Sequence, residues 1–320
     1  MAEGPYLEFE RPILELEKKI SDMKDFSAGE NIDFSGEIAS LEKKLERLRI
    51  DIYTNLSRWQ RVQLSRHPKR PYTLDYINLI STDFIELHGD RHFADDKAVV
   101  GGLATIENRR VLIVGQQKGR DTKQKLIRNF GMAHPEGYRK ALRLFQMADK
   151  FGLPIVILID TPGAFPGIGA EERGQAEAIA KNIQAMFTFR VPIVVVIIGE
   201  GASGGALGIG IGDRVMMLEY SWYSVISPEG CAAILWRDAA KAPEAAEALK
   251  VTADDLMSLG IIDKIIPEPP GGAHNDHEAI AKDVRTEILA ALDELTQKDV
   301  DTLLRERLEK YRRMGVFEEL

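Results

Sequence analysis

Two short apolar segments, residues 154–159 and 192–198, constrain the fold of this chain more than any other feature of the sequence. Both are of strand length and apolar at consecutive positions, so their side chains suit burial on both faces of a sheet. A stretch predicted as one long helix, residues 171–189, lies between them. Strands of this kind joined by helices are typical of a parallel sheet that is covered by helices. The sequence therefore predicts an α/β fold.

Other segments continue this pattern along the chain. The side chains of Tyr138, Leu142 and Phe145 share one face of a predicted helix, and Ile280 and Val284 begin a four-residue repeat near the C-terminus. We predict paired strands at residues 99–106 and 111–114 around an Asn108-Arg109-Arg110 turn, a helix at 135–151, a strand at 214–218 and C-terminal helices from about residue 277.

The N-terminal part of the chain, residues 1–70, has the pattern of a helical arm. Ile13, Leu16 and Ile20 repeat at steps of three and four, and a similar stripe returns at residues 38–56 after a polar break. Charged residues fill the other faces, as expected of two helices that pair as a hairpin or pack against a partner subunit. A proline-containing run ends the pattern. We therefore predict an arm at residues 1–70 and a second domain at residues 71–320.

Charge and cysteine content exclude several classes of protein. The 320 residues include 42 Lys and Arg against 50 Asp and Glu, a formal net charge of −8, which argues against a nucleic-acid binder. Cys231 is the single cysteine, so neither an intrachain disulfide nor a thiolate zinc cluster is expected. The apolar runs are too short to cross a bilayer and the sequence opens without a secretory signal pattern, which predicts a cytoplasmic protein without membrane contact.

A glycine-rich segment, residues 199–212, follows the second apolar strand. Residues 199–204 match the dinucleotide fingerprint Gly-x-Gly-x-x-Gly. The match is weak because two strand–helix units precede it and the nearest downstream acid, Glu219, comes too early for a ribose contact. A nucleotide hydrolase is also excluded. Residues 160–163 resemble a switch motif, but the sequence has no Walker A lysine and hydroxyl to hold phosphates.

The glycine segment and the loop at residues 160–167 make better sense as a pair. Each follows an apolar strand, and neighbouring parallel strands end at the same edge of a sheet, where ligands bind in such folds. Gly204 and Gly205 at a helix start offer backbone N–H groups, and the turn at residues 163–165 offers a second set. Two converging amides form an oxyanion hole. The residues alone leave this interpretation and simple close packing of glycines equally open.

Four motifs occur in order along the chain. They are Gly131-Met132-Ala133-His134-Pro135-Glu136-Gly137-Tyr138-Arg139-Lys140, Asp160-Thr161-Pro162-Gly163-Ala164, Gly201-Ala202-Ser203-Gly204-Gly205-Ala206 and Ser227-Pro228-Glu229-Gly230-Cys231. Together these motifs resemble the family of carboxyltransferase alpha subunits of bacterial-type acetyl-CoA carboxylases. The likeness covers nearly the whole chain, including the helical arm.

The resemblance implies a fold and a set of partners. The fold is a crotonase-like (ClpP/crotonase) superhelix of ββα units with an N-terminal helical arm and C-terminal helices. The partners are a beta subunit that carries the zinc, in an α2β2 heterotetramer, a biotin carboxyl carrier protein, and the biotin carboxylase component that uses ATP. The implied reaction transfers the carboxyl group of carboxybiotin to acetyl-CoA and yields malonyl-CoA, the first committed step of fatty acid synthesis.

The resemblance also implies a site made of backbone amides. In such a reaction biotin itself acts as the base, and the protein supplies orientation and amide donors for developing oxyanions. One oxyanion hole belongs to each kind of subunit, and the hole in this chain would hold the biotin ureido oxygen. The predicted site consists of an oxyanion hole at Gly204 and Gly205 with Ala164 or Phe165, and a carboxybiotin pocket at Gly163, Gly201 and Ala206.

A self-contained crotonase-type acyl-CoA hydratase or hydrolase is the alternative. Hydratases of the superfamily carry one carboxylate shortly after the helix-start glycines, where this chain has Leu207, and a second near Glu229. Without the first carboxylate, hydration by a carboxylate pair is disfavoured, and Glu229 is expected to be structural or substrate-adjacent. His134 is expected to cap a helix or lie at an interface, and Cys231 to lie in the core.

A basic segment precedes the first motif. Its side chains suit contact with CoA phosphates or with the beta subunit, although a solvated surface is the simpler interpretation. The residues are Lys118, Arg120, Lys123, Lys125 and Arg128.

Overall fold

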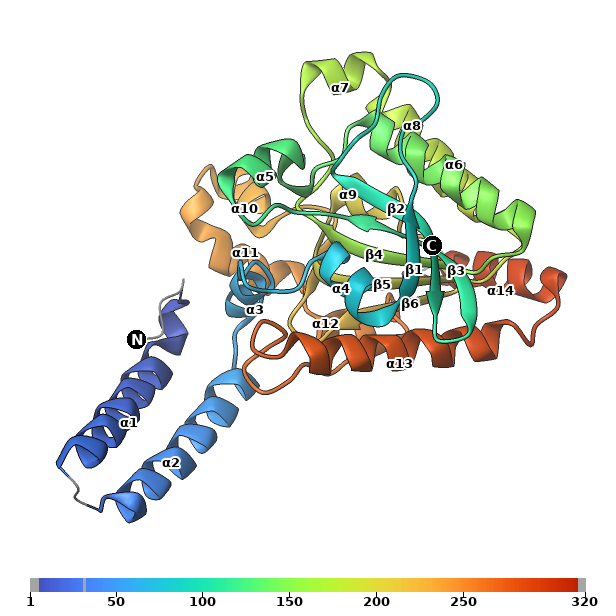
Figure 1. Cartoon of the computed structure of the whole chain (residues 1–320). Coiled ribbons are helices and arrows are strands. Elements are labelled where there is room, and N and C mark those ends of the chain that lie inside the picture. The colour runs from blue at the N-terminus through green and yellow to red at the C-terminus, as the bar shows by residue number, and fades with distance from the viewer. Residues whose placement is uncertain (1–5, 31–32, 316–320) are drawn as a thin grey trace.

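The computed structural model describes residues 6–30 and 33–315, in which one mixed sheet is flanked by helices (Figure 1). The strands are β1 Thr82–Glu86, β2 Val99–Ile106, β3 Arg109–Gln116, β4 Ile155–Thr161, β5 Ile193–Ala202, β6 Arg214–Leu218, β7 Trp222–Ser224 and β8 Lys264–Ile266. Their order is β1-β2-β3-β4-β5-β6-β8, with β7 paired to the end of β5. β1, β2 and β3 are antiparallel neighbours, and β3 to β6 and β8 run parallel.

Alternation along β4 and β5 supplies two cores, one on each face of the sheet. Ile155, Ile157 and Ile159 face the layer that contains α6 Pro135–Phe151 and α8 Gln175–Met186. Val156 and Leu158 face the opposite layer, with α4 Thr73–Ile80 and α13 His277–Leu295. Because successive side chains of a strand point to opposite faces, an uninterrupted apolar run is required for a sheet covered on both sides. The predicted α/β fold is confirmed.

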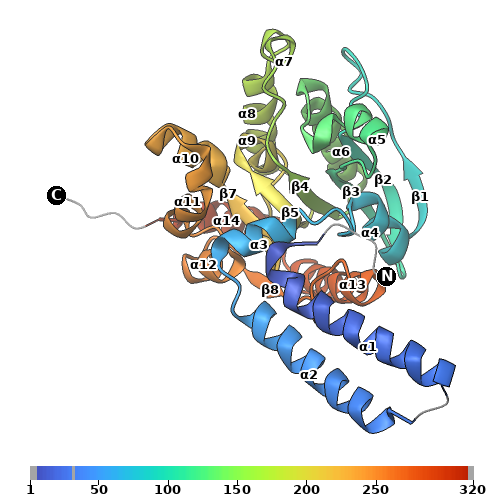
Figure 2. The ribbon, with the colours of Figure 1, turned by 90° about the vertical axis from the view of Figure 1, so that its left-hand side faces the viewer.

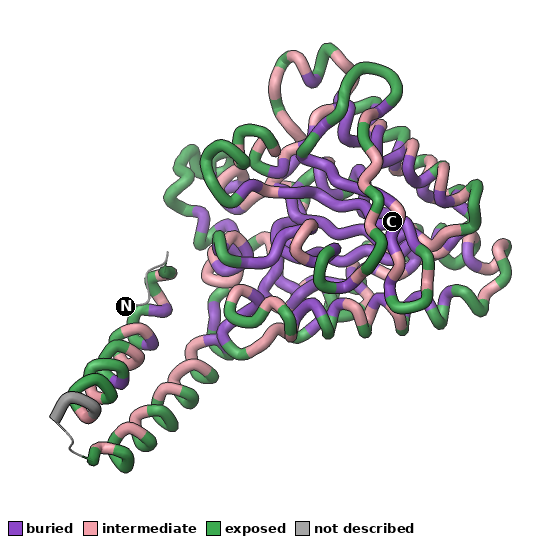
Figure 3. The backbone as a smooth tube through the Cα atoms, in the orientation of Figure 1, coloured by how far each residue is buried: buried purple, intermediate pink, exposed green. Residues whose placement is uncertain are grey.

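The other helices lie around this layered body. Burial is deepest in the sheet and decreases toward the helical surface (Figure 3). Within the described residues, none of the helices is long and apolar enough to span a bilayer. The remaining helices are η1 Glu8–Glu10, α1 Arg11–Glu30, α2 Ser35–Thr54, α3 Arg58–Ser65, α5 Thr122–Ile127, η2 Asn129–Gly131, α7 Ile168–Glu172, α9 Ser203–Leu207, α10 Pro228–Trp236, η3 Ala239–Lys241, α11 Ala242–Leu249, α12 Ala253–Ser258 and α14 Val300–Arg312.

Two predicted elements differ from the structure. The single helix expected at residues 171–189 is wrong, because Gly174 adopts φ +82° and separates α7 from α8. This left-handed conformation suits glycine and interrupts the helical path. The turn between β2 and β3 lies at residues 107–108, so Arg109 and Arg110 belong to the strand.

The first two helices form an antiparallel hairpin that projects from the body (Figures 1 and 2). Ile13 and Ile20 are buried along its inner seam. At its base, the hydroxyl of Tyr53 donates a 2.5 Å hydrogen bond to the buried carboxylate of Glu10. α3 follows the hairpin and packs against α11, β5 and β7, so the chain passes onto the body before residue 70.

A buried ion pair fixes the last helix to the sheet. Arg307 of α14 donates to both carboxylate oxygens of Asp213 at 2.8 and 2.7 Å. It also donates to the carbonyls of Met186, Phe189 and Val191. The side chain of Arg307 is fully buried, so these bonds replace the water that its guanidinium loses.

We predict that Arg307→Met lowers the free energy of unfolding by about 3 to 5 kcal/mol, because Asp213 is left buried without its cation. Urea denaturation followed by circular dichroism measures the change. The control is Arg305→Met, since Arg305 is exposed on the same helix; its effect should stay within about 0.5 kcal/mol. Equal stability of the two variants would contradict the role given to Arg307.

Candidate active site

The predicted loops meet at the carboxyl edge of the sheet. β4 and β5 are parallel neighbours, with Ile155 opposite Ile193 and Thr161 opposite Gly201. The loop after Thr161 and the α9 turn after Ala202 therefore leave the sheet side by side, as predicted. Ligands bind at this edge in open α/β sheets.

The two loops touch through their backbones at Gly205. A Cβ on Gly205 would lie 2.3 Å from the carbonyl carbon of Gly163 and 2.4 Å from the nitrogen of Ala164. Gly163 itself has φ +147°, a conformation that disfavours other residues. Both glycines are therefore required for this close approach, whatever ligand the edge binds.

Backbone N–H groups remain available at this contact. Gly204 and Gly205 lie in the first turn of α9, where the helix supplies no acceptors for N–H groups. The N–H of Ala164 has no hydrogen-bond partner within residues 6–30 and 33–315. The N–H of Phe165 differs, because it donates to the carbonyl of Ala133 at 3.0 Å. The candidate donor from this loop is thus Ala164.

Two buried side chains hold the first turn of α9 from behind. Gln116, the last residue of β3, donates from Nε2 to the carbonyl of Gly205 at 3.1 Å. Its Oε1 accepts a hydrogen bond from the N–H of Asp160 at 3.1 Å. The hydroxyl of Tyr138 donates to the same Gly205 carbonyl at 3.3 Å. The position of the turn is therefore set by β3 and α6 as well as by β5.

A buried network of charges lies under the loops. Lys118 Nζ is 2.7 Å from Asp160, the penultimate residue of β4, and 2.5 Å from Glu200 near the end of β5. Arg66 lies 2.6 Å from Glu200 and also pairs with Glu229. Burial raises the pKa of Asp160. Burial also acts to raise the pKa of Glu200, but the charges of Lys118 and Arg66 outweigh it and hold that pKa below its ordinary value. The network joins the ends of both strands.

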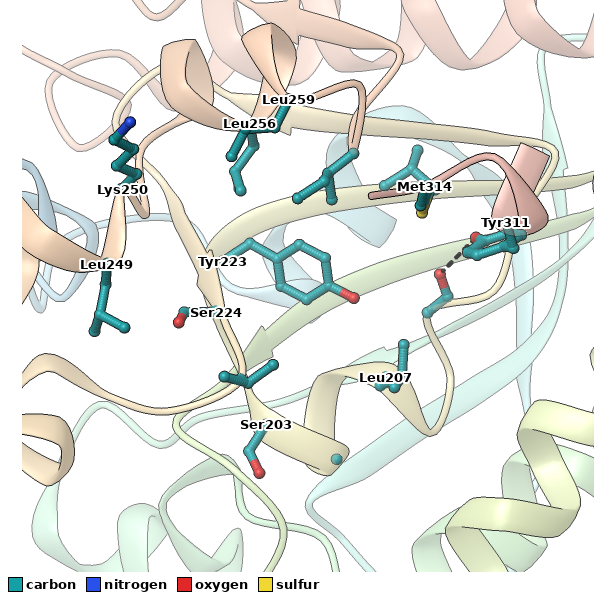
Figure 4. A pocket seen from close by; sticks show the side chains of 15 residues that line it. Ser203, Leu207, Tyr223, Ser224, Leu249, Lys250, Leu256, Leu259, Tyr311 and Met314 are labelled. Carbon is teal, nitrogen blue, oxygen red and sulfur yellow. Dashed lines mark hydrogen bonds between the residues drawn. The ribbon is translucent and has the colours of Figure 1, made fainter. Parts of the chain in front are cut away.

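A cavity of about 560 Å³ opens at the start of α9 (Figure 4). Gly204 lines it, whereas Gly163, Ala164 and Gly205 are not among its lining residues. Its surface is largely apolar, and Lys250 is the only charged residue among the described residues that line it. Burial raises the pKa of Tyr223 to about 12, so this hydroxyl is neutral near pH 7. The lining residues are Ser203, Gly204, Leu207, Gly210, Val215, Tyr223, Ser224, Val225, Leu249, Lys250, Leu256, Leu259, Ile261, Tyr311 and Met314.

The other residues of the predicted site occupy different places. Gly204 lines the cavity, whereas Ala206 is buried in the core and Gly201 lies against the ring of Tyr223. Leu207 is 40% exposed at the cavity, where a hydratase would need a carboxylate. Glu229 pairs with Arg66 and shares no wall of this cavity.

The basic segment does not form one anion-binding surface. Lys118 forms ion pairs in the buried network, and Arg120 pairs with Asp75. Lys123 is exposed on α5, Lys125 is half-buried there, and Arg128 donates to the carbonyl of Lys97 at 2.8 Å. Lys118, Arg120 and Arg128 thus bond to separate groups of the protein.

Two residues outside the basic segment have defined packing. His134 directly precedes α6 and stacks on Phe165 with a ring separation of 4.1 Å. Its backbone N–H donates to Asp96 at 2.6 Å. Cys231 is buried, as predicted.

Sequence reasoning missed Arg66, Gln116 and Glu200 as parts of this edge. Gln116 lies two positions after the strand predicted at residues 111–114, and Glu200 interrupts the glycine segment. A polar residue just after an apolar strand was the available signal. No such signal marked Arg66, because its partners Glu200 and Glu229 lie 134 and 163 positions away in the sequence.

Comparison with known proteins decides the family. A family model described as acetyl co-enzyme A carboxylase carboxyltransferase-like matches residues 6–315. The chain belongs to this carboxyltransferase family. It is 58% identical over 319 residues to the acetyl-coenzyme A carboxylase carboxyl transferase subunit alpha of Geobacter metallireducens, covering 100% of both chains. It is 56% identical to the subunit of that name from Thermus thermophilus, covering 98% of this chain and 99% of the relative.

Solved structures with lower identity share the fold. A chain of a Pseudomonas malonate decarboxylase hetero-tetramer in complex with coenzyme A is 18% identical, with a TM-score of 0.60, covering 75% of this chain and 93% of that chain. Transcarboxylase 12S is 23% identical, with a TM-score of 0.57, covering 70% of this chain and 42% of that chain. The crotonase-like fold of the carboxyltransferase family is therefore confirmed.

The charge network generates a prediction about pH. Lys118→Met removes the direct cation partner of Asp160, so we expect a loss of about 3 to 5 kcal/mol in unfolding free energy near pH 8. Without its cation, the buried carboxylate of Asp160 has a raised pKa. The folded variant therefore keeps a proton on Asp160 at pH values where the unfolded chain, with a pKa of about 4, has released it. Its deficit relative to wild type should shrink as the pH falls toward 5.

Urea denaturation at both pH values measures this deficit. Lys123→Met serves as the control, because Lys123 is exposed, and its effect should be within about 0.5 kcal/mol at either pH. A deficit for Lys118→Met that stays constant with pH would show that Asp160 does not depend on this cation.

Proposed function

We propose that the chain is the alpha subunit of the carboxyltransferase of acetyl-CoA carboxylase, which transfers the carboxyl group from carboxybiotin to acetyl-CoA to form malonyl-CoA. One observation carries the proposal: the chain aligns end to end with alpha subunits at 58% identity. The geometry supports it, because the carboxyl edge of the sheet offers backbone donors beside an apolar cavity that lacks acidic residues among its described lining. A lining with one cation and no acid among its described residues suits the bicyclic urea and the carboxylate of carboxybiotin better than a cationic ligand.

The residues of this chain have a defined task in the proposed reaction. When bound, carboxybiotin supplies the CO2 and the base. The N–H groups of Gly204, Gly205 and Ala164 would hold the ureido oxygen and would stabilise negative charge on it. These donors are fixed before the reaction by the contact of Gly205 with Gly163, so little reorganisation accompanies the charge change. The apolar walls beside Gly204 lower the local polarity, which strengthens hydrogen bonds made there.

The proposed reaction requires other chains. The beta subunit carries the second oxyanion hole and the zinc, and joins this chain in an α2β2 assembly. A biotin carboxyl carrier protein presents the biotin, and a separate biotin carboxylase recharges it with ATP. We place this assembly in the cytoplasm, and we assign the arm at residues 1–70 to contact with another subunit.

The hydratase alternative receives no support from the cavity. Leu207 occupies the wall beside the helix-start glycines, and Glu229 is paired with Arg66 away from it. Burial would raise the pKa of Glu229, but Arg66 holds it below its ordinary value, which is unsuited to a general acid near pH 7.

Reconstitution tests the proposed function. The purified chain is mixed with a beta subunit, and malonyl-CoA-dependent carboxylation of biotin is measured with each subunit alone and with both. We expect turnover only with both subunits. Robust hydration of enoyl-CoA or hydrolysis of acyl-CoA by the chain alone would contradict the proposal.

Gly205→Val tests the amide contact. A side chain at this position would overlap the backbone of Gly163 and Ala164, so the loops must separate and the donors lose their alignment. We expect carboxyl transfer to fall by about 100-fold or more. The control is Gly36→Ala in α2, where nothing lies within 4 Å of the added Cβ. Full activity of a folded Gly205→Val variant would rule out the amide role.

A further inference from the structure

We infer that Gln116 is a positioning residue for carboxyl transfer. Its side chain holds α9 and the end of β4 at a fixed separation. This inference rests on the proposed function. Gln116 is fully buried, and its side-chain amide bonds to both sides of the functional edge. It does not itself touch the cavity.

The two bonds of Gln116 define its geometry. Oε1 accepts from the N–H of Asp160, which precedes the loop that presents Ala164. Nε2 donates to the carbonyl of Gly205, within the turn that presents the other donors. One planar amide therefore sets the distance between the two halves of the amide pair. Contact between Gly205 and Gly163 prevents the halves from moving closer, and Gln116 prevents them from moving apart.

The carbonyl of Gly205 has an unusual dependence on side chains. α9 has five residues and ends at Leu207, and the N–H of Ile209 bonds to Ala206 instead of Gly205. Gln116 and Tyr138 supply the donors that a longer helix would have supplied from its own backbone. Loss of Gln116 would leave Tyr138, at 3.3 Å, as the sole side-chain donor to this carbonyl among the described residues.

Gln116→Leu is the first test variant. In the reconstituted complex we expect kcat to fall on the order of 10-fold to 100-fold, because displaced donors stabilise the transition state less. KM for acetyl-CoA should change much less, since Gln116 only positions donors for the other substrate. Thermal unfolding of the chain confirms that the variant is folded.

Gln116→Glu adds a readout that a purely structural role would not produce. An ionised glutamate can still accept from Asp160 N–H but turns an oxygen without hydrogen toward the Gly205 carbonyl. A protonated glutamate restores the donor. Lys118 favours ionisation of the introduced glutamate, whereas Asp160 and Glu200 oppose it. Arg66 pairs with Glu200, and Tyr138 contributes a neutral hydroxyl. The kcat of the variant relative to wild type should therefore rise as the pH falls from 8 to 6.

Gln117→Leu is the matched control. Gln117 is the next residue, is also buried, and also uses both ends of its amide, but on the N–H of Leu74 and the carbonyl of Lys118. The substitution Gln117→Leu should leave kcat unchanged. If the wild-type complex is active and Gln116→Leu and Gln117→Leu have equal kcat, or if Gln116→Glu shows no pH dependence relative to wild type, the inference is overturned. An inactive wild-type complex would instead overturn the proposed function and the inference built on it.

Discussion

The parallel pairing of β4 with β5 determines what the carboxyl edge of this protein can do. Their register brings Thr161 opposite Gly201, so the chain leaves both strands at one level. The loop and the α9 turn then meet through bare backbone, because glycine at position 205 leaves no side chain between them. A shift of either strand by one residue would reverse the faces of its side chains and separate these turns. The candidate site is therefore a consequence of strand register.

Charged residues stabilise this edge without entering its cavity. Lys118 and Arg66 neutralise Asp160 and Glu200 beneath the loops, whereas the cavity wall is apolar and carries Lys250 alone as a charge among its described residues. A buried carboxylate without its cation would be costly, so the network resists separation of the two strand ends. Rigid support outside the cavity and neutral walls inside it suit a site that works through hydrogen bonds from the backbone.

Much of the fold could be predicted because it depends on local pattern. The apolar runs predicted β4 and β5, the shared face of Tyr138, Leu142 and Phe145 predicted α6, and the four-residue repeat predicted α13. The prediction of a single helix at residues 171–189 was wrong because of Gly174, which adopts a left-handed conformation. Residue spacing alone does not distinguish such a glycine from one that a helix tolerates. In the site, Gly163 and Gly205 were predicted to approach, since their loops follow neighbouring strands. Gln116 and Arg66 were not, because long-range hydrogen bonds leave no periodic signal in a sequence.

The hairpin of α1 and α2 has a further consequence for how the molecule loses structure. Its two helices pack along one seam, and most of its surface is exposed, whereas β4 and β5 are buried along their whole length (Figure 3). Regions with few buried contacts open locally at a lower free energy than the core requires. We therefore expect the distal part of the hairpin to open before the body unfolds, so that its amide hydrogens exchange with solvent sooner than those of the central strands.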